Sequence, residues 1–223
     1  AGRADAATQT ASQPRQRSIA MVSARWNLGT ISAYFGPWIG ALRAAGWWVD
    51  VYHVGAMVDA VSEHIAASPS RFRHLPGPLA EVAAELRESA PAAILYPEIG
   101  LSPRVYPLAA LRLAPLQLAA WGHPVSSGLA SIDVWLSCAE MEPIDGASHY
   151  RERLQVLPGL GTCYARPAKV ATRARDQLGL PESGRLYLAA HAPVKLHPTF
   201  DELIARIVAA DRSATVVMFE DSA

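Results

Sequence analysis

Short apolar runs alternate with helical patterns along most of this chain. Runs rich in β-branched, aromatic and other apolar residues predict strands at 19–23, 48–54, 93–96, 116–121, 132–137 and 154–157. Helical patterns lie between them, at 31–45, 57–67, 79–89 and 108–113, and a further helix is expected to close at 149–153. Because strands and helices alternate, we expect a parallel sheet with helices on both faces.

The same alternation starts again after a Pro- and Gly-rich stretch at 158–168. There the sequence predicts, in order, a helix, a strand, a helix and a strand, at 170–178, 185–190, 200–210 and 215–219. We therefore expect a complete N-terminal Rossmann-like α/β domain at 18–165. Residues 166–223 would be the first βαβ of a second Rossmann-like domain, which is truncated here. Residues 1–17 are small, polar and aperiodic, which predicts a disordered leader or linker.

Composition excludes several classes of partner. The 20 Lys and Arg balance the 20 Asp and Glu, and no basic run occurs, so neither nucleic acid nor an anionic membrane surface is expected to bind. No stretch approaches the roughly 20 apolar residues of a membrane span. Two cysteines are too few for a disulfide framework or a structural zinc site, so we expect no metal and a cytoplasmic location.

The loop at 121–128 follows a predicted strand, so it lies at the carboxyl edge where open α/β sheets bind ligands. Gly122 would let the backbone approach a ligand, and Ser126 and Ser127 offer hydroxyl and N–H groups. His123 can exchange a proton near neutral pH. The alternative is a tight turn with a structural histidine that bonds the backbone.

Two further loops are expected at the same edge. Glu98 follows the strand at 93–96 and could orient a substrate hydroxyl or a histidine; alternatively it caps the helix that comes next. In the loop at 23–30, a substrate could contact Asn27, Gly29 and Thr30.

The loop at 191–198 lies between a predicted strand and the helix at 200–210. The N-terminus of a helix attracts anions, and Lys195 could neutralise a phosphate there as a point charge, with His191 nearby. A solvated surface lysine is the alternative. His191 and His197 are separated by a spacing that fits no common zinc site.

Four strings in order resemble the catalytic region of the O-linked N-acetylglucosaminyltransferase family, the SPINDLY-like group, in its bacterial form. They are RLAPLQ at 112–117; WGHP at 121–124, with SG at 127–128 and ID at 132–133; HYRERL at 149–154, with LP at 157–158; and KLHP at 195–198. The form of this string with histidine, WGHP, also resembles that of the related protein N-glucosyltransferases.

The resemblance implies a GT-B-type fold, in which two Rossmann-like domains face each other across a cleft. It implies an inverting, metal-independent transfer of a sugar from a UDP-sugar donor to a Ser or Thr hydroxyl of a protein or peptide acceptor, with no other cofactor. GlcNAc is the sugar that the family favours, and glucose stays open. Lys195 matches the family lysine that contacts the diphosphate, and Gly122, His123 and Pro124 match the loop near the donor sugar and the acceptor.

One departure from the family pattern leaves alternatives open. The family usually has a histidine in the loop after the first strand, where this chain has Gly29. If a base is used, it would then be His123 or a residue outside this sequence, and Glu98 is the other catalytic candidate. The chain could instead be a non-catalytic α/β module that binds a sugar nucleotide or a protein. Another GT-B enzyme, such as a sugar-nucleotide 2-epimerase, is the third possibility.

Overall fold

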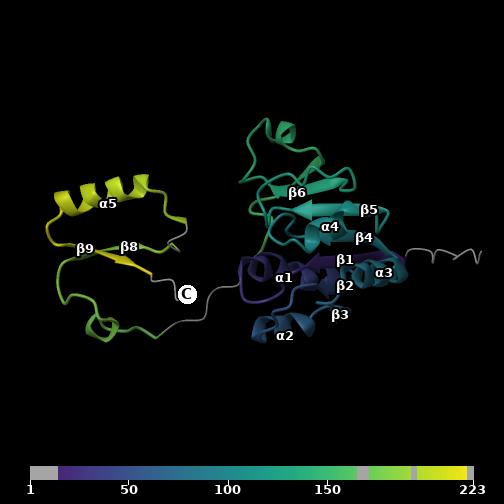
Figure 1. Ribbon diagram of the computed structural model, residues 1–223, viewed down its shortest axis with the longest axis horizontal. Coiled ribbons are helices and arrows are strands. Elements are labelled where there is room, and N and C mark those ends of the chain that lie inside the picture. Colours follow the sequence, from purple (N-terminus) through teal and green to yellow (C-terminus); the bar gives the residue numbers. More distant parts are fainter. Residues whose placement is uncertain (1–14, 165–170, 192–194, 220–223) are drawn as a thin grey trace, which may run out of the picture. The chain divides into compact units, whose positions relative to one another are not determined.

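The structure is a computed structural model that describes residues 15–164, 171–191 and 195–219 (Figure 1). The chain divides into two compact units, residues 1–165 and 166–223, which are described separately below. Most of the leader expected at 1–17 and the end of the stretch expected at 158–168 lie outside the described residues. Residues 15–17 were expected in the leader, and this was wrong, because they belong to the first strand.

A seven-stranded parallel sheet forms the centre of the first unit. Its order is β3-β2-β1-β4-β5-β6-β7. The strands are β1 (Arg15–Ser23), β2 (Trp48–His53), β3 (Arg71–His74), β4 (Pro91–Tyr96), β5 (Leu116–Ala120), β6 (Val134–Cys138) and β7 (Arg153–Leu157). The chain adds β2 and β3 on one side of β1 and β4 to β7 on the other. The order therefore reverses between β1 and β4, and a crevice for ligands is expected outside the carboxyl ends of these two strands.

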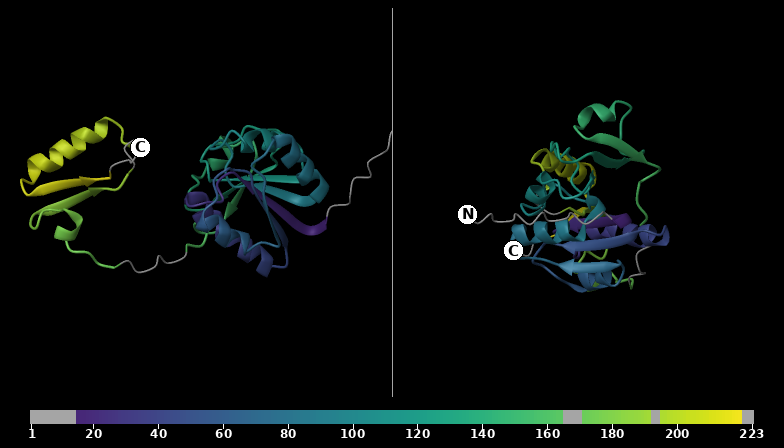
Figure 2. Two further views of the ribbon diagram at one scale, coloured as in Figure 1. Left: turned by 60° about the horizontal axis from the view of Figure 1, so that its bottom comes forward. Right: turned by 90° about the vertical axis from the view of Figure 1, so that its right-hand side faces the viewer.

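Helices cover both faces of this sheet (Figure 2). They are α1 (Thr30–Ala44), α2 (Ala60–Ala66), α3 (Leu79–Ser89) and α4 (Val105–Ala110). Successive side chains of β1 alternate between the faces, as a strand requires. Ala20 and Val22 pack in the core beneath α3 and α4, whereas Ile19 and Met21 pack in the core beneath α1 and α2. The doubly wound arrangement expected from the alternation is confirmed for this unit.

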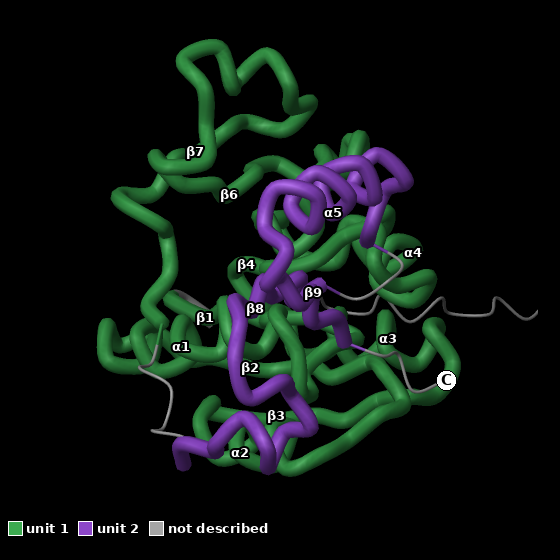
Figure 3. The backbone as a smooth tube through the Cα atoms, turned by 90° about the vertical axis from the view of Figure 1, so that its left-hand side faces the viewer, with its two compact units in different colours: residues 1–165 green, residues 166–223 purple. Residues whose placement is uncertain are grey.

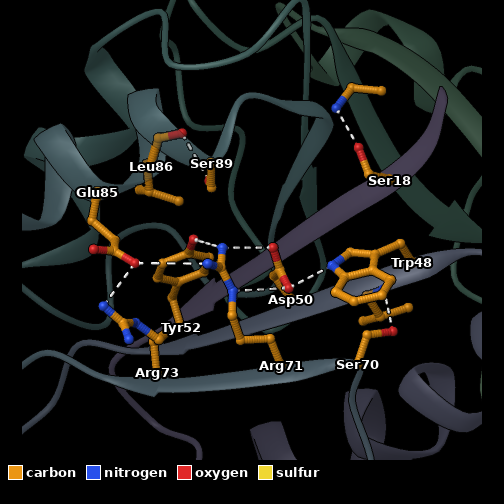
Figure 4. Close-up of polar contacts among 12 residues, drawn as sticks. Ser18, Trp48, Asp50, Tyr52, Ser70, Arg71, Arg73, Glu85, Leu86 and Ser89 are labelled. Atoms are coloured by element: carbon orange, nitrogen blue, oxygen red, sulfur yellow. Dashed lines mark hydrogen bonds and ion pairs between the residues drawn. The ribbon is translucent and has the colours of Figure 1, made fainter. Parts of the chain in front are cut away.

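The edge strand β3 was not expected, because its four residues, RFRH, hold a single apolar side chain. Ion pairs fasten it to its neighbours (Figure 4). Arg71 Nη2 lies 2.9 Å from Asp50 Oδ2 and donates to the Tyr52 hydroxyl, and Arg73 lies 2.9 Å from Glu85 Oε1 on α3. Long-range polar contacts therefore support this strand, and local propensity did not reveal it.

Three helix predictions differ from the structure. The helix expected at 108–113 is α4, which ends at Ala110, in keeping with the bias of Pro115 against helix in the residue before it.

The helix expected to close at 149–153 is wrong. A 3-10 turn, η1 (Gly146–His149), is followed directly by β7, and Tyr150 leaves the turn to stack on Trp135. Of the helix expected at 170–178, the described part contains only a 3-10 turn, η2 (Asp176–Leu178). Residues 171–174 are exposed, so no packed face supports a helix there.

The second unit is a βαβ motif made of β8 (Arg185–Ala189), α5 (Thr199–Ala210) and β9 (Ala214–Met218) (Figure 3). The two strands pair in parallel, as a crossover helix between them requires. Phe200, Ile204 and Ile207 of α5 are half-buried, whereas Leu203 and Val208 are exposed. In the part of the chain that the structure describes, no helix has the length and apolarity to cross a membrane.

Candidate functional site

Glu98 connects the ends of the two strands between which the sheet order reverses. The Ser23 hydroxyl, at the end of β1, donates to Glu98 Oε1 over 2.7 Å, and the Ala24 N–H donates to the same oxygen over 3.1 Å. Ser23 Oγ in turn accepts from the Arg25 N–H. Glu98 thus fastens the loop after β1 to the loop after β4. It does not cap a helix, because α4 begins only at Val105.

The Glu98 carboxyl is fully buried and only half satisfied. Its Oε2 has no hydrogen-bond partner among the described residues. Burial raises the pKa of Glu98 to about 7, against the hydrogen bonds from Ser23 and Ala24 and the charge of Arg25, which lower it. A carboxyl with a pKa in this range can both hold and release a proton at neutral pH, as general acid–base groups must.

The His123 ring packs against Gly100, which belongs to the loop after β4. A Cβ atom placed on Gly100 would lie 2.6 Å from His123 Cδ2, and Gly100 has a φ of 110°. Glycine is therefore required at this position for two independent reasons. His123 is half-buried, and its ring nitrogens have no hydrogen-bond partner within the described residues, so the expected alternative of a backbone-bonded histidine finds no support.

Gly122 packs closely against the Pro97 carbonyl and the Ile31 side chain. Its N–H donates to the Pro97 carbonyl over 3.0 Å. A Cβ atom there would lie 2.4 Å from that oxygen and 2.6 Å from Ile31 Cδ1. The close approach expected of Gly122 is therefore made to protein atoms, and it joins the His123 loop to the loop of Glu98. Pro124, next to His123, is exposed.

Ser126 and Ser127 both bond Glu152. Ser126 Oγ donates to Glu152 Oε2 over 2.7 Å, and the Ser127 N–H donates to Oε1 over 2.9 Å. The Ser127 hydroxyl also donates to Oε1. In this structure, then, both hydroxyls are directed at a protein carboxylate. Burial alone would raise the pKa of Glu152, but hydrogen bonds from Ser127 and Ser126 outweigh it and hold the pKa below its usual range.

The loop between β1 and α1 lies at the same carboxyl edge. Asn27 is half-buried, and Gly29 and Thr30 are exposed. Gly29 is the N-cap of α1, and a Cβ atom there would meet nothing within 4 Å. The Leu28 N–H donates to Asp59 Oδ2 over 2.7 Å, which ties this loop to the N-cap residue of α2. A hollow of about 520 Å³ starts beside Gly29 and runs between α1 and α2 over mainly apolar side chains.

Lys195 and His191 belong to the second unit. Both are exposed, and both line a hollow of about 410 Å³ ahead of α5, together with His197 and Thr199. The Thr199 N–H, at the start of α5, donates to His197 Nδ1 over 3.3 Å. Residues 192–194 of the predicted loop lie outside the described residues.

Nowhere among the described residues do three His, Cys, Asp or Glu side chains gather in a way that could hold a metal ion.

The strings singled out in the sequence also bond one another. Arg112 Nη1 lies 2.6 Å from Asp133 Oδ2, and the same oxygen accepts from the Gln117 N–H over 2.8 Å. The Gln117 side chain donates to the Ser131 carbonyl over 2.8 Å. Much of the motif pattern therefore specifies the frame that carries the loops. Ser23 was missed by the sequence reasoning, where its position at the end of a strand was the available signal.

No protein-family model matches the sequence, and no curated protein matches it. Forty-five solved chains do match in structure. One of them is a mutant form of an O-GlcNAc transferase from Thermobaculum terrenum, with a TM-score of 0.75 and 18% sequence identity. The match covers 93% of this chain and 40% of that one, so this chain spans well under half of the matched protein. At this identity the likeness concerns the fold.

Proposed function

We propose that this chain forms part of a GT-B-type glycosyltransferase that transfers a sugar from a UDP-sugar to a Ser or Thr hydroxyl of a protein. GlcNAc is the first candidate for this sugar, and glucose is the second. One observation carries the proposal. Buried Glu98 and half-buried His123, whose nitrogens have no partner within the described residues, lie on two loops that meet at Gly100 and Gly122, beside the reversal point of a doubly wound sheet. Sheets of this kind bind ligands at that point. The fold likeness to an O-GlcNAc transferase adds support.

In the proposed reaction His123 is the general base. Its neutral imidazole takes the proton of the acceptor hydroxyl while the hydroxyl oxygen forms a bond to the anomeric carbon. The bond from that carbon to the diphosphate oxygen breaks on the opposite face, which inverts the configuration and releases UDP. Gly29 offers no rival base in the loop after β1.

Lys195 and the N-terminal end of α5 are proposed to stabilise the leaving diphosphate. A lysine and oriented backbone groups can neutralise the charge that develops there without a metal ion. Lys195 and His191 line the same hollow beside the start of α5, which supports this role. Glu98 is proposed to hold the loop with Asn27, Gly29 and Thr30 in place for the sugar.

A non-catalytic sugar-nucleotide module is the second candidate, and Gly29 favours it. Calorimetric titration of the full-length protein with UDP, UDP-GlcNAc and UDP-glucose tests both candidates. The enzyme proposal expects binding that Lys195→Ala weakens by roughly tenfold or more, whereas Arg206→Ala, an exposed cation on α5, leaves binding unchanged. His123→Ala should bind UDP normally and lose turnover. If the wild type binds the nucleotides without turnover, the non-catalytic module is favoured. If it binds none of them, both candidates are contradicted.

A further inference from the structure

Glu152 holds one end of the loop that carries His123. Its side chain is buried and accepts three hydrogen bonds, two from Ser127 and one from Ser126, so both carboxylate oxygens are used. Glu152 lies 25 residues beyond Ser127 along the chain. The bonds therefore join distant segments and do not reflect a local turn.

The loop is fixed at two points. At its start the Gly122 N–H is bonded to the Pro97 carbonyl. At its end stand the two serines on Glu152, with the Tyr106 hydroxyl donating to the Ser127 carbonyl over 3.3 Å. Between these points lie His123 and two exposed residues, 124 and 125. Loss of the bonds to Glu152 would leave the imidazole ring held by the bond at Gly122, by its packing on Gly100 and by the Tyr106 bond to Ser127.

Glu152 itself stands on a rigid support. The next residue starts β7, and the Arg153 N–H donates to the Asp133 carbonyl over 3.1 Å. Two residues before it, Tyr150 stacks on buried Trp135 with 5.1 Å between ring centroids. The carboxylate is thus held by the sheet and its core, and it can transmit that rigidity to the loop.

A carboxylate suits this position better than an amide. Ser126 Oγ already accepts from the Gly128 N–H at 3.3 Å and the Arg151 N–H at 3.4 Å. Its own proton therefore needs an acceptor, which Glu152 Oε2 supplies. In Glu152→Gln, an amide that keeps its oxygen on Ser127 would turn an NH₂ group toward Ser126, and that hydroxyl would face only donors.

We infer that Glu152 is a positioning residue, which acts through Ser126 and Ser127 to hold His123 at the carboxyl edge of the sheet. The inference rests on the proposed function for its catalytic consequence. Its structural content, a fixed His123, stands by itself. Glu152 touches no reacting atom in this scheme, and Ser126 and Ser127 serve the loop frame.

The test compares Glu152→Gln and the double variant Ser126→Ala/Ser127→Ala with the control Glu140→Gln in the full-length protein. Glu140 is an exposed carboxylate two residues after β6, and it bonds neither the His123 loop nor Tyr150. Steady-state kinetics with UDP-GlcNAc, UDP affinity, and the ¹H–¹³C resonance of the His123 imidazole, assigned through His123→Gln, are measured for each.

Glu152→Gln should lower kcat by about 100-fold, since a small misplacement of a catalytic group costs this much. UDP affinity should stay within about twofold, because Glu152 does not contact the nucleotide. The His123 resonance should shift or broaden in Glu152→Gln and in the double-serine variant, and stay unchanged in Glu140→Gln. Adding the serine changes to Glu152→Gln should cost nothing more.

An unmoved His123 resonance in folded Glu152→Gln overturns the inference, whether or not the wild type transfers sugar. If Glu152→Gln does not fold, the double-serine variant decides by the same resonance. If the wild type shows no turnover, the proposed function is wrong. The His123 resonance then still tests whether Glu152 fixes the position of His123. A kcat that falls equally in Glu140→Gln would also contradict a specific role for Glu152.

Discussion

The Ser23 hydroxyl donates to Glu98 Oε1 over 2.7 Å across the line where the strand order of the sheet reverses. This bond unites the loops after β1 and β4, and the second of these loops also supports the His123 ring at Gly100. One buried carboxyl therefore organises the edge at which a ligand is expected. Its burial has consequences that can be measured without knowledge of the substrate.

Glu98→Gln should change how stability depends on pH. The pKa of Glu98 is about 7 in the folded protein, against 4.5 for an unperturbed glutamate. Because the folded value is raised, its contribution to stability is full below the unfolded pKa and is lost as pH rises toward 7. The neutral amide removes this loss. The free energy of unfolding of Glu98→Gln, relative to that of the wild type, should therefore rise by roughly 2 to 3 kcal/mol between about pH 5 and about pH 8.

Urea unfolding followed by tryptophan fluorescence measures this difference, and all six tryptophans lie in the first unit. Glu88→Gln, at an exposed acid on α3, is the control and should show no such trend. A constant difference between Glu98→Gln and wild type over this range would show that the folded protein does not hold the Glu98 proton.

Gly122→Ala should destabilise the first unit by about 1 to 3 kcal/mol, because the new methyl group would overlap the Pro97 carbonyl and Ile31. Gly29→Ala is the matched control. Its methyl group meets nothing within 4 Å, and its φ of 162° is extended backbone, so the cost should stay under about 1 kcal/mol. Equal midpoints of urea unfolding for the two variants would contradict the close packing at Gly122.

Asp133→Ala should cost more stability than Arg112→Ala, although the two side chains form one ion pair. Arg112 is largely exposed, and surface pairs contribute about 1 kcal/mol or less. Asp133 also accepts the Gln117 N–H, which would lose its partner, at a cost of about 1 to 3 kcal/mol. Urea unfolding of both single variants and the double variant separates the two effects. Equal costs for the two single variants would show that Asp133 serves Arg112 alone.

The sequence predicted the layout of the fold well where apolar periodicity was strong. The face of α3 with Val82, Ala83 and Leu86 is buried as its spacing required. β3 escaped prediction because its Arg71 is held by Asp50 of β2 and Glu85 of α3, which are distant in the sequence. The false helix near residue 150 has a similar cause, since the Tyr150 stack on Trp135 and the bonds of Glu152 to the serines are tertiary contacts.

Prediction of the site was less complete. Sequence placed His123 and Glu98 at strand ends, and both lie at the expected carboxyl edge. It assigned Ser126 and Ser127 to a substrate, whereas their hydroxyls are bonded to Glu152. A hydroxyl's partner 25 residues away leaves no local pattern, so spacing cannot distinguish a binding serine from an anchoring one.

The most direct test of the central proposal is sugar transfer itself. The full-length protein is incubated with UDP-GlcNAc or UDP-glucose and a protein acceptor; UDP release is quantified, the acceptor is examined by mass spectrometry, and the anomeric configuration of the product is read by NMR. We expect UDP release coupled to a hexose-based adduct on Ser or Thr with inverted configuration, and loss of both in His123→Ala. Release of UDP with no adduct, an epimerised free sugar, or undiminished transfer by His123→Ala would contradict it.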